Sequence, residues 1–140
     1  MADKLHTRLI TQERTLFEGE VSSIVAPAVD GYLGIKPKHA PLMSALGDGV
    51  LKIKSGDEEA FYVVFGGFLQ VKDNRVIVLA DNATSAEEID PAELEKEIAG
   101  SRTALDAGTG DRDKAAELRS SLARAQVSYR ALRLSGRVPN

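Results

Sequence analysis

The chain has 140 residues, of which 43% are hydrophobic and 28% are charged, and its formal net charge is −3. This length and composition predict a globular protein with one core of ordinary size, or with a small core and an appendage. The chain contains no cysteine, which excludes disulfides and thiolate metal sites and fits a reducing compartment. Its longest apolar run, Ala60 to Phe65, is far shorter than the ~20 residues of a membrane-spanning helix. We therefore expect no direct membrane insertion.

Strands are predicted in the first part of the chain by short runs of β-branched and aromatic residues between turn residues. These runs cover residues 5–10, 21–28, 42–46, 50–54, 60–65, 68–71 and 75–80. Because no helical pattern separates them, we predict an antiparallel β-sandwich or flattened barrel over residues 1–84. Val76 to Leu79 is apolar throughout, which predicts burial on both faces. Gly66 and Gly67 predict a bulge or a tight crossing between strands, and no phosphate-loop motif surrounds them.

The segment from Gly31 to Leu42, GYLGIKPKHAPL, combines turn residues with polar side chains. Its glycines permit unusual backbone conformations and its prolines fix φ, so a helix is excluded. Lys36, Lys38 and His39 place polar groups between these turn residues. Two interpretations stay open at this point. The segment is either a loop shaped for contact with a partner, or a hairpin whose glycines and prolines serve only the fold.

Two helices are predicted after residue 84. Asp90 can cap the first one, Pro91 suits its first turn, and Glu93 occupies the capping-box position. A break at residues 108–111 separates it from the second helix, which makes the two helices antiparallel neighbours. The expected contact stripes are Leu94, Ile98, Ser101 and Leu105 on the first helix and Ala115, Leu118, Leu122, Ala125, Tyr129 and Leu132 on the second. Because these stripes have few large side chains, we expect the hairpin to need a docking surface and to act as a switch.

Charge is distributed unevenly along the helical part. Residues 81–106 carry eight acidic and two basic side chains, whereas residues 111–137 carry seven basic and three acidic ones. Such segments attract each other, and the basic one also suits an acidic partner, although exposed charges of this kind usually form only a solvated surface.

Residue patterns for catalysis are missing from the sequence. His6 and His39 are its only histidines, and it has no H-E-x-x-H, G-x-S-x-G or EF-hand motif. Ser44 and Asp48 complete no triad with His39, because no nucleophile elbow surrounds the serine. No basic patch with interleaved aromatic residues indicates nucleic-acid binding. We therefore expect a protein that is not an enzyme and binds neither a metal nor nucleic acid.

A family resemblance covers nearly the whole chain. Residues 31–42 closely resemble the G-x-L-G-I-x-P-x-H-A-P-L signature of the epsilon subunits of F-type ATP synthases, which are called delta in mitochondria. Phe65 to Val71 and Val76 to Ala80 resemble the S/F-G-G-F-x-E-V and V-T-V-L-A blocks of that family. Leu122 to Ala125 and Leu132 to Leu134 occupy the place of its last helix.

This resemblance implies a non-catalytic rotor subunit at the cytoplasmic face of the cell membrane, which couples the proton-driven c-ring to the catalytic head. The β-sandwich would bind the gamma subunit on one side and rest on the c-ring on the other. The c-ring-facing residues that it implies are Gly31, Tyr32, Gly34, Lys36, Lys38 and His39. Tyr32 stands where several bacterial members have an acidic residue, so it offers no charge for such a contact. His39 also fits a purely structural role in the loop.

The helical hairpin, residues 85–140, resembles the regulatory domain of the family. That domain folds against the sandwich or extends along gamma toward the alpha and beta subunits, where it inhibits ATP hydrolysis. The side chains expected to meet an acidic segment of beta are Arg119, Arg124, Arg130 and Arg133. Salt would weaken this contact by screening.

Some bacterial members bind ATP on the folded hairpin through an I-D-x-x-R-A motif and additional arginines. Ile89 and Asp90 match this motif, and Arg124 is equivalent to a second-helix arginine. Glu93, however, replaces the motif arginine, and Leu94 replaces its alanine. Because a carboxylate facing a phosphate is unfavourable, we expect no cofactor, and ATP binding through Ile89, Asp90 and Arg124 stays open as an alternative.

Two other classes of function stay open. A stand-alone β-sandwich that binds a ligand or senses nucleotides would be a stable monomer with its own pocket. An enzyme would need His39 for turnover. Copurification with gamma would distinguish the subunit from both.

Overall fold

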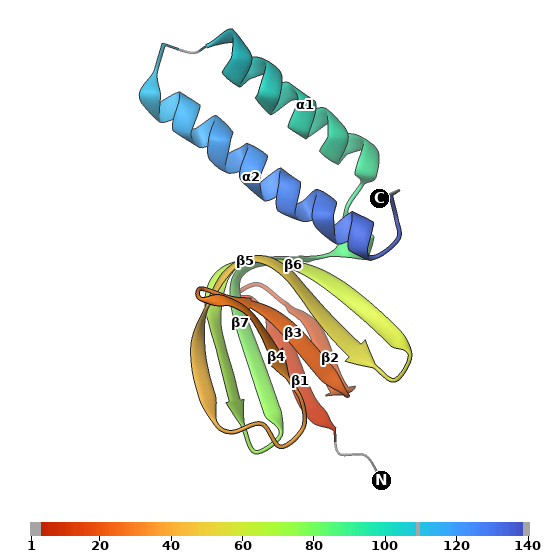
Figure 1. Ribbon diagram of the computed structural model, residues 1–140. Coiled ribbons are helices and arrows are strands. Elements are labelled where there is room, and N and C mark those ends of the chain that lie inside the picture. The colour runs from red at the N-terminus through yellow and green to blue at the C-terminus, as the bar shows by residue number, and fades with distance from the viewer. Residues whose placement is uncertain (1–3, 109, 139–140) are drawn as a thin grey trace.

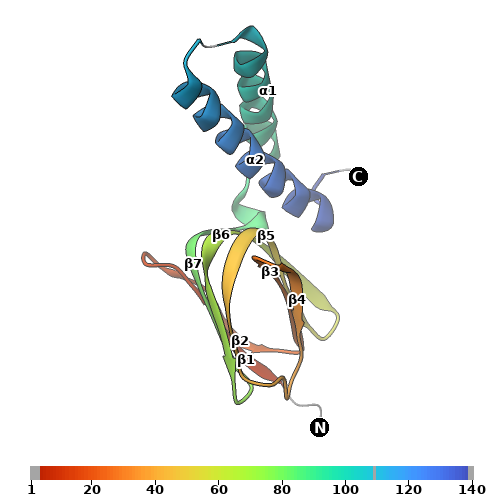
Figure 2. The same cartoon turned by 60° about the vertical axis from the view of Figure 1, so that its left-hand side comes forward.

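The computed structural model describes residues 4–108 and 110–138, and it contains a seven-stranded sheet followed by two helices (Figure 1). The strands are β1 (Leu5–Ile10), β2 (Thr15–Val21), β3 (Ser23–Ala28), β4 (Gly31–Ile35), β5 (Leu42–Ser55), β6 (Glu58–Lys72) and β7 (Arg75–Ser85). Their order in the sheet is β2-β1-β7-β6-β5-β3-β4. The strands curve around one core as a flattened barrel, with the helices at one end (Figure 2). This confirms the predicted β-sandwich with a helical hairpin.

The sheet is mixed, which corrects the prediction of an antiparallel one. β1 pairs with β7 in parallel, for example His6 with Arg75, whereas the other strand pairs are antiparallel. Antiparallel pairing is imposed where a short turn joins two strands, but β1 and β7 are the first and last strands of the sheet. Their relative direction therefore depends on the whole topology.

Strand boundaries also differ from the prediction. β2 and β4 were not expected as strands, and β5 and β6 each join two predicted runs into one strand. β6 continues through Gly66 and Gly67 without a register shift against β7. Gly67 has φ 122°, and a Cβ there would lie 2.1 Å from the carbonyl oxygen of Leu79. The glycine pair therefore forms the predicted tight crossing, in a conformation that other residues rarely adopt.

The main core lies inside the barrel. Its members are apolar side chains from all seven strands, and Thr7 of β1 is the polar residue buried among the strands that the structure describes. The largest side chains with under 2% exposure there are Leu5, Leu9, Ile24, Ile35, Leu51, Ile53 and Leu69. The buried members of this cluster all belong to the strands and include no helix residue.

The linker and helices follow β7. A 3₁₀ turn, η1 (Ala86–Glu88), leads to α1 (Pro91–Ala107) and α2 (Arg112–Leu134). Asp90 caps α1, because its Oδ1 accepts hydrogen bonds from the backbone N–H groups of Ala92 (2.9 Å) and Glu93 (3.3 Å). This confirms the predicted helix start.

The two helices contact each other along the predicted stripes. Leu94 of α1 packs with Ala125 and Leu132 of α2, and all three are buried. Ser101 of α1 is also buried, with 8% exposure. The seam between the helices therefore has the predicted composition, in which small residues permit close approach.

α2 has a second apolar side that the stripe did not predict. Ala131 is fully buried and packs with Val50 of β5, Val63 of β6 and Ala86 of η1. Val127, one turn earlier, is half-buried against the same cluster. We call this contact the docking interface, because it holds the hairpin on the sandwich.

Candidate functional site

The segment from Gly31 to Leu42 spans the length of the barrel. Tyr32 of β4 lies at the helix end, where the Cζ of Arg130 from α2 is 5.5 Å from its ring centroid. The segment that follows β4 lies at the opposite end, which we call the far end, beside the β6–β7 turn (Figure 1). There the backbone N–H of Lys38 donates to Asn74 Oδ1 at 2.6 Å.

The six predicted c-ring-facing residues therefore do not form one cluster. Gly31 and Tyr32 lie at the helix end and the others follow along β4 to the far end, where Lys36 and Lys38 are exposed. His39 is half-buried, and its Nδ1 lies 2.8 Å from the carbonyl oxygen of Ala40, so the ring donates from that nitrogen. The sequence suggested one loop because a strand of five residues was not recognised in it.

Three of the four predicted regulatory arginines lie over aromatic rings. Arg124 is 5.6 Å from the ring centroid of Phe65 in β6, and Arg130 reaches Tyr32 in β4. Arg133 lies over Tyr129 of its own helix at 5.3 Å. Arg119 is exposed. Such cation–π contacts are attractive, so Arg124 and Arg130 add to the docking of α2.

A cavity of about 420 Å³ lies beside the Arg130–Tyr32 contact. It is lined by Val25, Tyr32, Val50, Lys52, Glu59, Phe61, Arg130 and Leu134. The Lys52 ammonium pairs with the Glu59 carboxylate at 3.1 Å on its rim. Its walls belong to both the sandwich and α2, so its shape depends on the docked hairpin.

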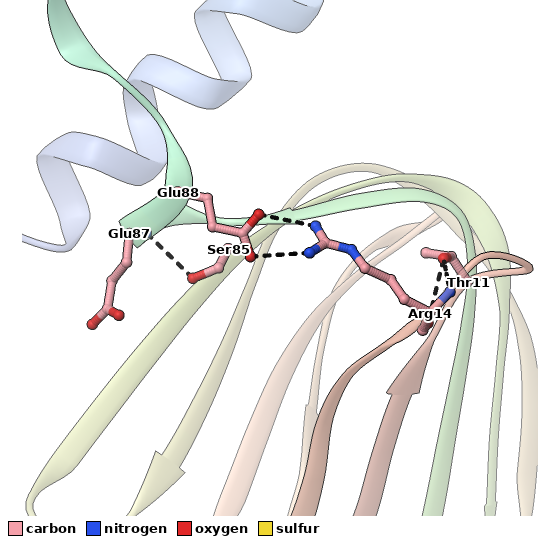
Figure 3. A network of polar contacts seen from close by, with 5 residues as sticks. All are labelled: Thr11, Arg14, Ser85, Glu87 and Glu88. Carbon is pink, nitrogen blue, oxygen red and sulfur yellow. Dashed lines mark hydrogen bonds and ion pairs between the residues drawn. The ribbon is translucent and has the colours of Figure 1, made fainter.

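A polar network fixes the linker to the sandwich (Figure 3). Arg14, in the β1–β2 turn, donates from Nη1 and Nη2 to the two carboxylate oxygens of Glu88 at 3.2 and 3.0 Å. This bidentate contact raises the pKa of the Arg14 guanidinium. Thr11 Oγ1 accepts from the backbone N–H of Arg14, and Ser85 Oγ accepts from that of Glu87. The sequence reasoning missed this network, because its two halves are 74 positions apart.

A second arginine binds the linker from the C-terminal side. Arg137 Nη1 donates to the carbonyl oxygens of Ala86 and Ile89, the latter at 2.7 Å. Nearby, burial raises the pKa of the Tyr62 phenol above its ordinary value of 10.0, and the charges of Glu87 and Glu88 add to this shift. The linker is thus held by a side chain from each end of the chain.

An exposed apolar surface covers the outside of β5, β6 and β7. Met43, Phe68, Ile77 and Leu79 are 69%, 60%, 39% and 42% exposed. Phe68 is the cross-strand partner of Leu79, and Gln70 lies between Met43 and Ile77 in the neighbouring row. These four residues therefore share one side of the sheet, which we call the outer apolar face. The prediction that Val76 to Leu79 is buried on both faces was wrong, because only Val76 and Val78 point into the core.

The residues that resemble an ATP motif have structural contacts here. Asp90 caps α1, Ile89 is half-buried between the two helical clusters, and Arg124 lies over Phe65. The described residues contain no group of His, Cys, Asp or Glu arranged to hold a metal ion. Neither helix, over its described residues, has the length and apolarity needed to span a membrane.

Comparison with known proteins gives a consistent result. Residues 4–86 match the family model described as the beta-sandwich domain of the ATP synthase delta/epsilon chain. The ATP synthase epsilon chain of Dehalococcoides mccartyi is 54% identical over 89 residues, which are 64% of this chain and 64% of that one. The chain thus matches just under two thirds of that relative's length. The ATP synthase epsilon chain of Teredinibacter turnerae is 39% identical over 134 residues, which are 94% of each chain.

Solved structures share the fold. A chain of the Euglena gracilis mitochondrial ATP synthase superposes with a TM-score of 0.68 at 22% identity, covering 89% of this chain and 74% of that one. A chain from the central stalk and c-ring of the Tetrahymena thermophila mitochondrial ATP synthase gives a TM-score of 0.58 at 17% identity, covering 93% and 97%. Together with the family model and the relative that matches along nearly the whole length, these findings establish that the chain belongs to the family of ATP synthase delta/epsilon chains.

Proposed function

We propose that this chain is a non-catalytic rotor subunit of an F-type ATP synthase, located at the cytoplasmic face of the cell membrane. The observation that carries the proposal is the 39% identity with an ATP synthase epsilon chain over 94% of both chains, because it includes the hairpin as well as the sandwich. In this role the chain transmits rotation between the c-ring and the catalytic head and performs no chemistry of its own.

The outer apolar face is the surface that we assign to the gamma subunit. Phe68 is 60% exposed and Met43 is 69% exposed, on a side of the sheet that no other part of the described chain covers. Large apolar side chains grouped in this way mark an interface more often than an ordinary surface. Phe68→Asp should therefore abolish copurification with gamma, while Lys54→Asp, at an exposed position elsewhere on the sheet, should preserve it.

The c-ring contact is assigned to the segment from Gly31 to His39. Because β4 places Tyr32 at the helix end and Lys38 at the far end, a photo-crosslinker at each position distinguishes the two orientations. We expect one of these positions to give a cross-link to subunit c in the assembled enzyme. Cross-links to subunit c from neither position would contradict this assignment.

We further propose that the hairpin, residues 85–140, is a regulatory domain whose docked form leaves ATP hydrolysis uninhibited. In support of this proposal, docking engages Arg124 with Phe65 and Arg130 with Tyr32, so these guanidinium groups are not free to meet an acidic partner. All three arginines are exposed in the docked form, and release would separate Arg124 and Arg130 from these rings, so that they could join Arg119 in contact with the beta subunit. Docking and inhibition would thus compete for the same side chains.

Two experiments test the proposal. Affinity purification of the tagged chain from its native cells, followed by mass spectrometry, should recover the subunits of the ATP synthase. A stable monomer without these partners would instead favour a stand-alone binding module. Second, deletion of the residues after Ala86 should leave assembly intact and raise ATP hydrolysis relative to the complex with the full chain. Unchanged hydrolysis would contradict the inhibitory role.

A further inference from the structure

The end of α2 is shaped so that the chain turns back onto the linker. Ser135 ends the helix, and Gly136 has φ 79°, a left-handed conformation suited to glycine. The backbone N–H of Gly136 donates to the carbonyl oxygen of Arg133 at 3.1 Å. The backbone N–H of Arg137 donates to the carbonyl oxygen of Leu132 at 2.9 Å. These two bonds form a Schellman motif, which reverses the direction of the chain.

This reversal brings Arg137 to the linker. Its guanidinium binds two carbonyl oxygens, those of Ala86 and Ile89, at the two ends of η1. The next residue, Val138, packs with Leu94 and Leu132 in the cluster between the helices. The last described residues therefore contact the linker, the start of α1 and the end of α2.

The two arginines that hold the linker have different roles. Arg14 belongs to the β1–β2 turn, so its contact with Glu88 joins the linker to the sandwich and does not involve α2. Arg137 joins the linker to the end of α2. When the end of α2 leaves the docking interface while Ala86 stays packed against Val50 and Val63, the bond of Arg137 to the carbonyl oxygen of Ala86 must break, whereas the bonds of Arg14 need not.

From this difference we infer that Arg137 is a latch for the hairpin. It holds α2 to the linker in the docked form, and its release is a required step in undocking. A guanidinium bound to two carbonyl oxygens makes charge-assisted hydrogen bonds, which are stronger than neutral ones. The inference concerns the docked hairpin alone and does not depend on the proposed partners.

Thiol labelling can measure undocking directly, because the natural chain has no cysteine. The thiol introduced by Ala131→Cys lies at a fully buried position of the docking interface, so it reacts only when α2 leaves the sandwich. A thiol introduced by Leu51→Cys, in the sandwich core at 0% exposure, reports on global unfolding instead. Each is placed in an otherwise unchanged chain, and the reaction rate with a small thiol reagent is measured under native conditions.

We expect Arg137→Gln to raise the labelling rate at position 131 at least about tenfold, the factor that corresponds to losing one of the two charge-assisted hydrogen bonds. The rate at position 51 should stay unchanged. Arg137→Lys should retain part of the protection, because a charged ammonium group donates charge-assisted hydrogen bonds to carbonyl oxygens, whereas the amide of glutamine is a neutral donor. Arg14→Gln is the matched control, because the bonds that it removes do not involve α2. It should keep the labelling rate at position 131 within about twofold of the rate without this substitution.

Three results would each overturn the inference. The first is an unchanged rate at position 131 in Arg137→Gln. The second is an equal rise at positions 131 and 51, which would show a loss of overall stability. The third is a rise in the labelling rate at position 131 that is as large in Arg14→Gln as in Arg137→Gln. This result would show that any contact that fixes the linker stabilises the docked form, and not Arg137 in particular.

Discussion

A charge placed in the docking interface should release the hairpin and leave the sandwich folded. Ala131 is fully buried among Val50, Val63 and Ala86, so the carboxylate of Ala131→Glu would lose its water on docking. Burying an ionised group without a partner costs at least about 3 kcal/mol in proteins. At about 1.4 kcal/mol for each factor of ten, the ratio of released to docked molecules should rise more than a hundredfold. The same substitution at Ala123, an exposed position of the same helix, should have no such effect.

Distances between two spin labels measure this release. The labels are attached to cysteines introduced by Asp57→Cys, in the exposed β5–β6 turn, and Ser120→Cys, at an exposed position of α2. The doubly labelled chain without a further substitution should give one narrow distribution of distances. Ala131→Glu should give a broader distribution with longer distances, and Ala123→Glu should give the same narrow distribution as the unsubstituted chain. A narrow distribution in Ala131→Glu would refute the reasoning, and so would equal broadening in both variants.

Three further predictions concern stability. Gly67→Ala should lower the free energy of unfolding in urea by about 3 kcal/mol or more, because the new Cβ combines a strained φ with an overlap on the backbone at Leu79. The control Gly34→Ala, whose Cβ would meet nothing within 4 Å, should change this free energy by less than about 0.5 kcal/mol. Asp90→Ala should cost about 1 kcal/mol and lower the hydrogen-exchange protection of the first turn of α1, and unchanged protection would exclude its capping role. Because the pKa of Tyr62 is raised in the folded state, the phenol loses its proton more readily in the unfolded chain. The stability that the neutral phenol contributes to folding is therefore complete below pH 10.0 and is lost as the pH rises further. The free energy of unfolding should therefore fall less steeply above that pH in Tyr62→Phe, and identical slopes would contradict this.

Local chemistry in the sequence predicted the helical part well. Asp90 and Pro91 mark the start of α1 with side-chain geometry that needs no tertiary context, and the stripe from Leu94 onward follows from helical periodicity alone. β4 was missed because two of its five residues are glycines, which weaken a strand signal. Its pairing with β3 at the edge of the sheet is a tertiary property.

Contacts between distant parts of the chain had no local signal. Arg14 and Glu88 look like ordinary surface residues, and only the fold brings them together. Burial of Ala131 was not predicted, because a single alanine close to Arg130 and Arg133 adds little to an apolar pattern. It is nevertheless fully buried. The outer apolar face had a partial signal in β6, because Gln70 indicates a solvent-facing position and Phe68, two residues earlier, lies on the same side of the strand. In β7 the continuous apolar run from Val76 to Leu79 concealed the alternation between core and solvent sides.

The parallel pairing of β1 with β7 has a consequence for the order in which the protein folds. His6 and Arg75 are neighbours in the sheet, so the barrel cannot close until the last strand has been synthesised. Pairings over such sequence separations slow folding, whereas the contacts of α1 with α2 are local and form quickly. During synthesis, the edge of β1 that pairs with β7 thus stays unpaired until β7, which directly precedes the linker, has been made. The hairpin is synthesised after β7, at a time when all the strands that build its docking surface are already present.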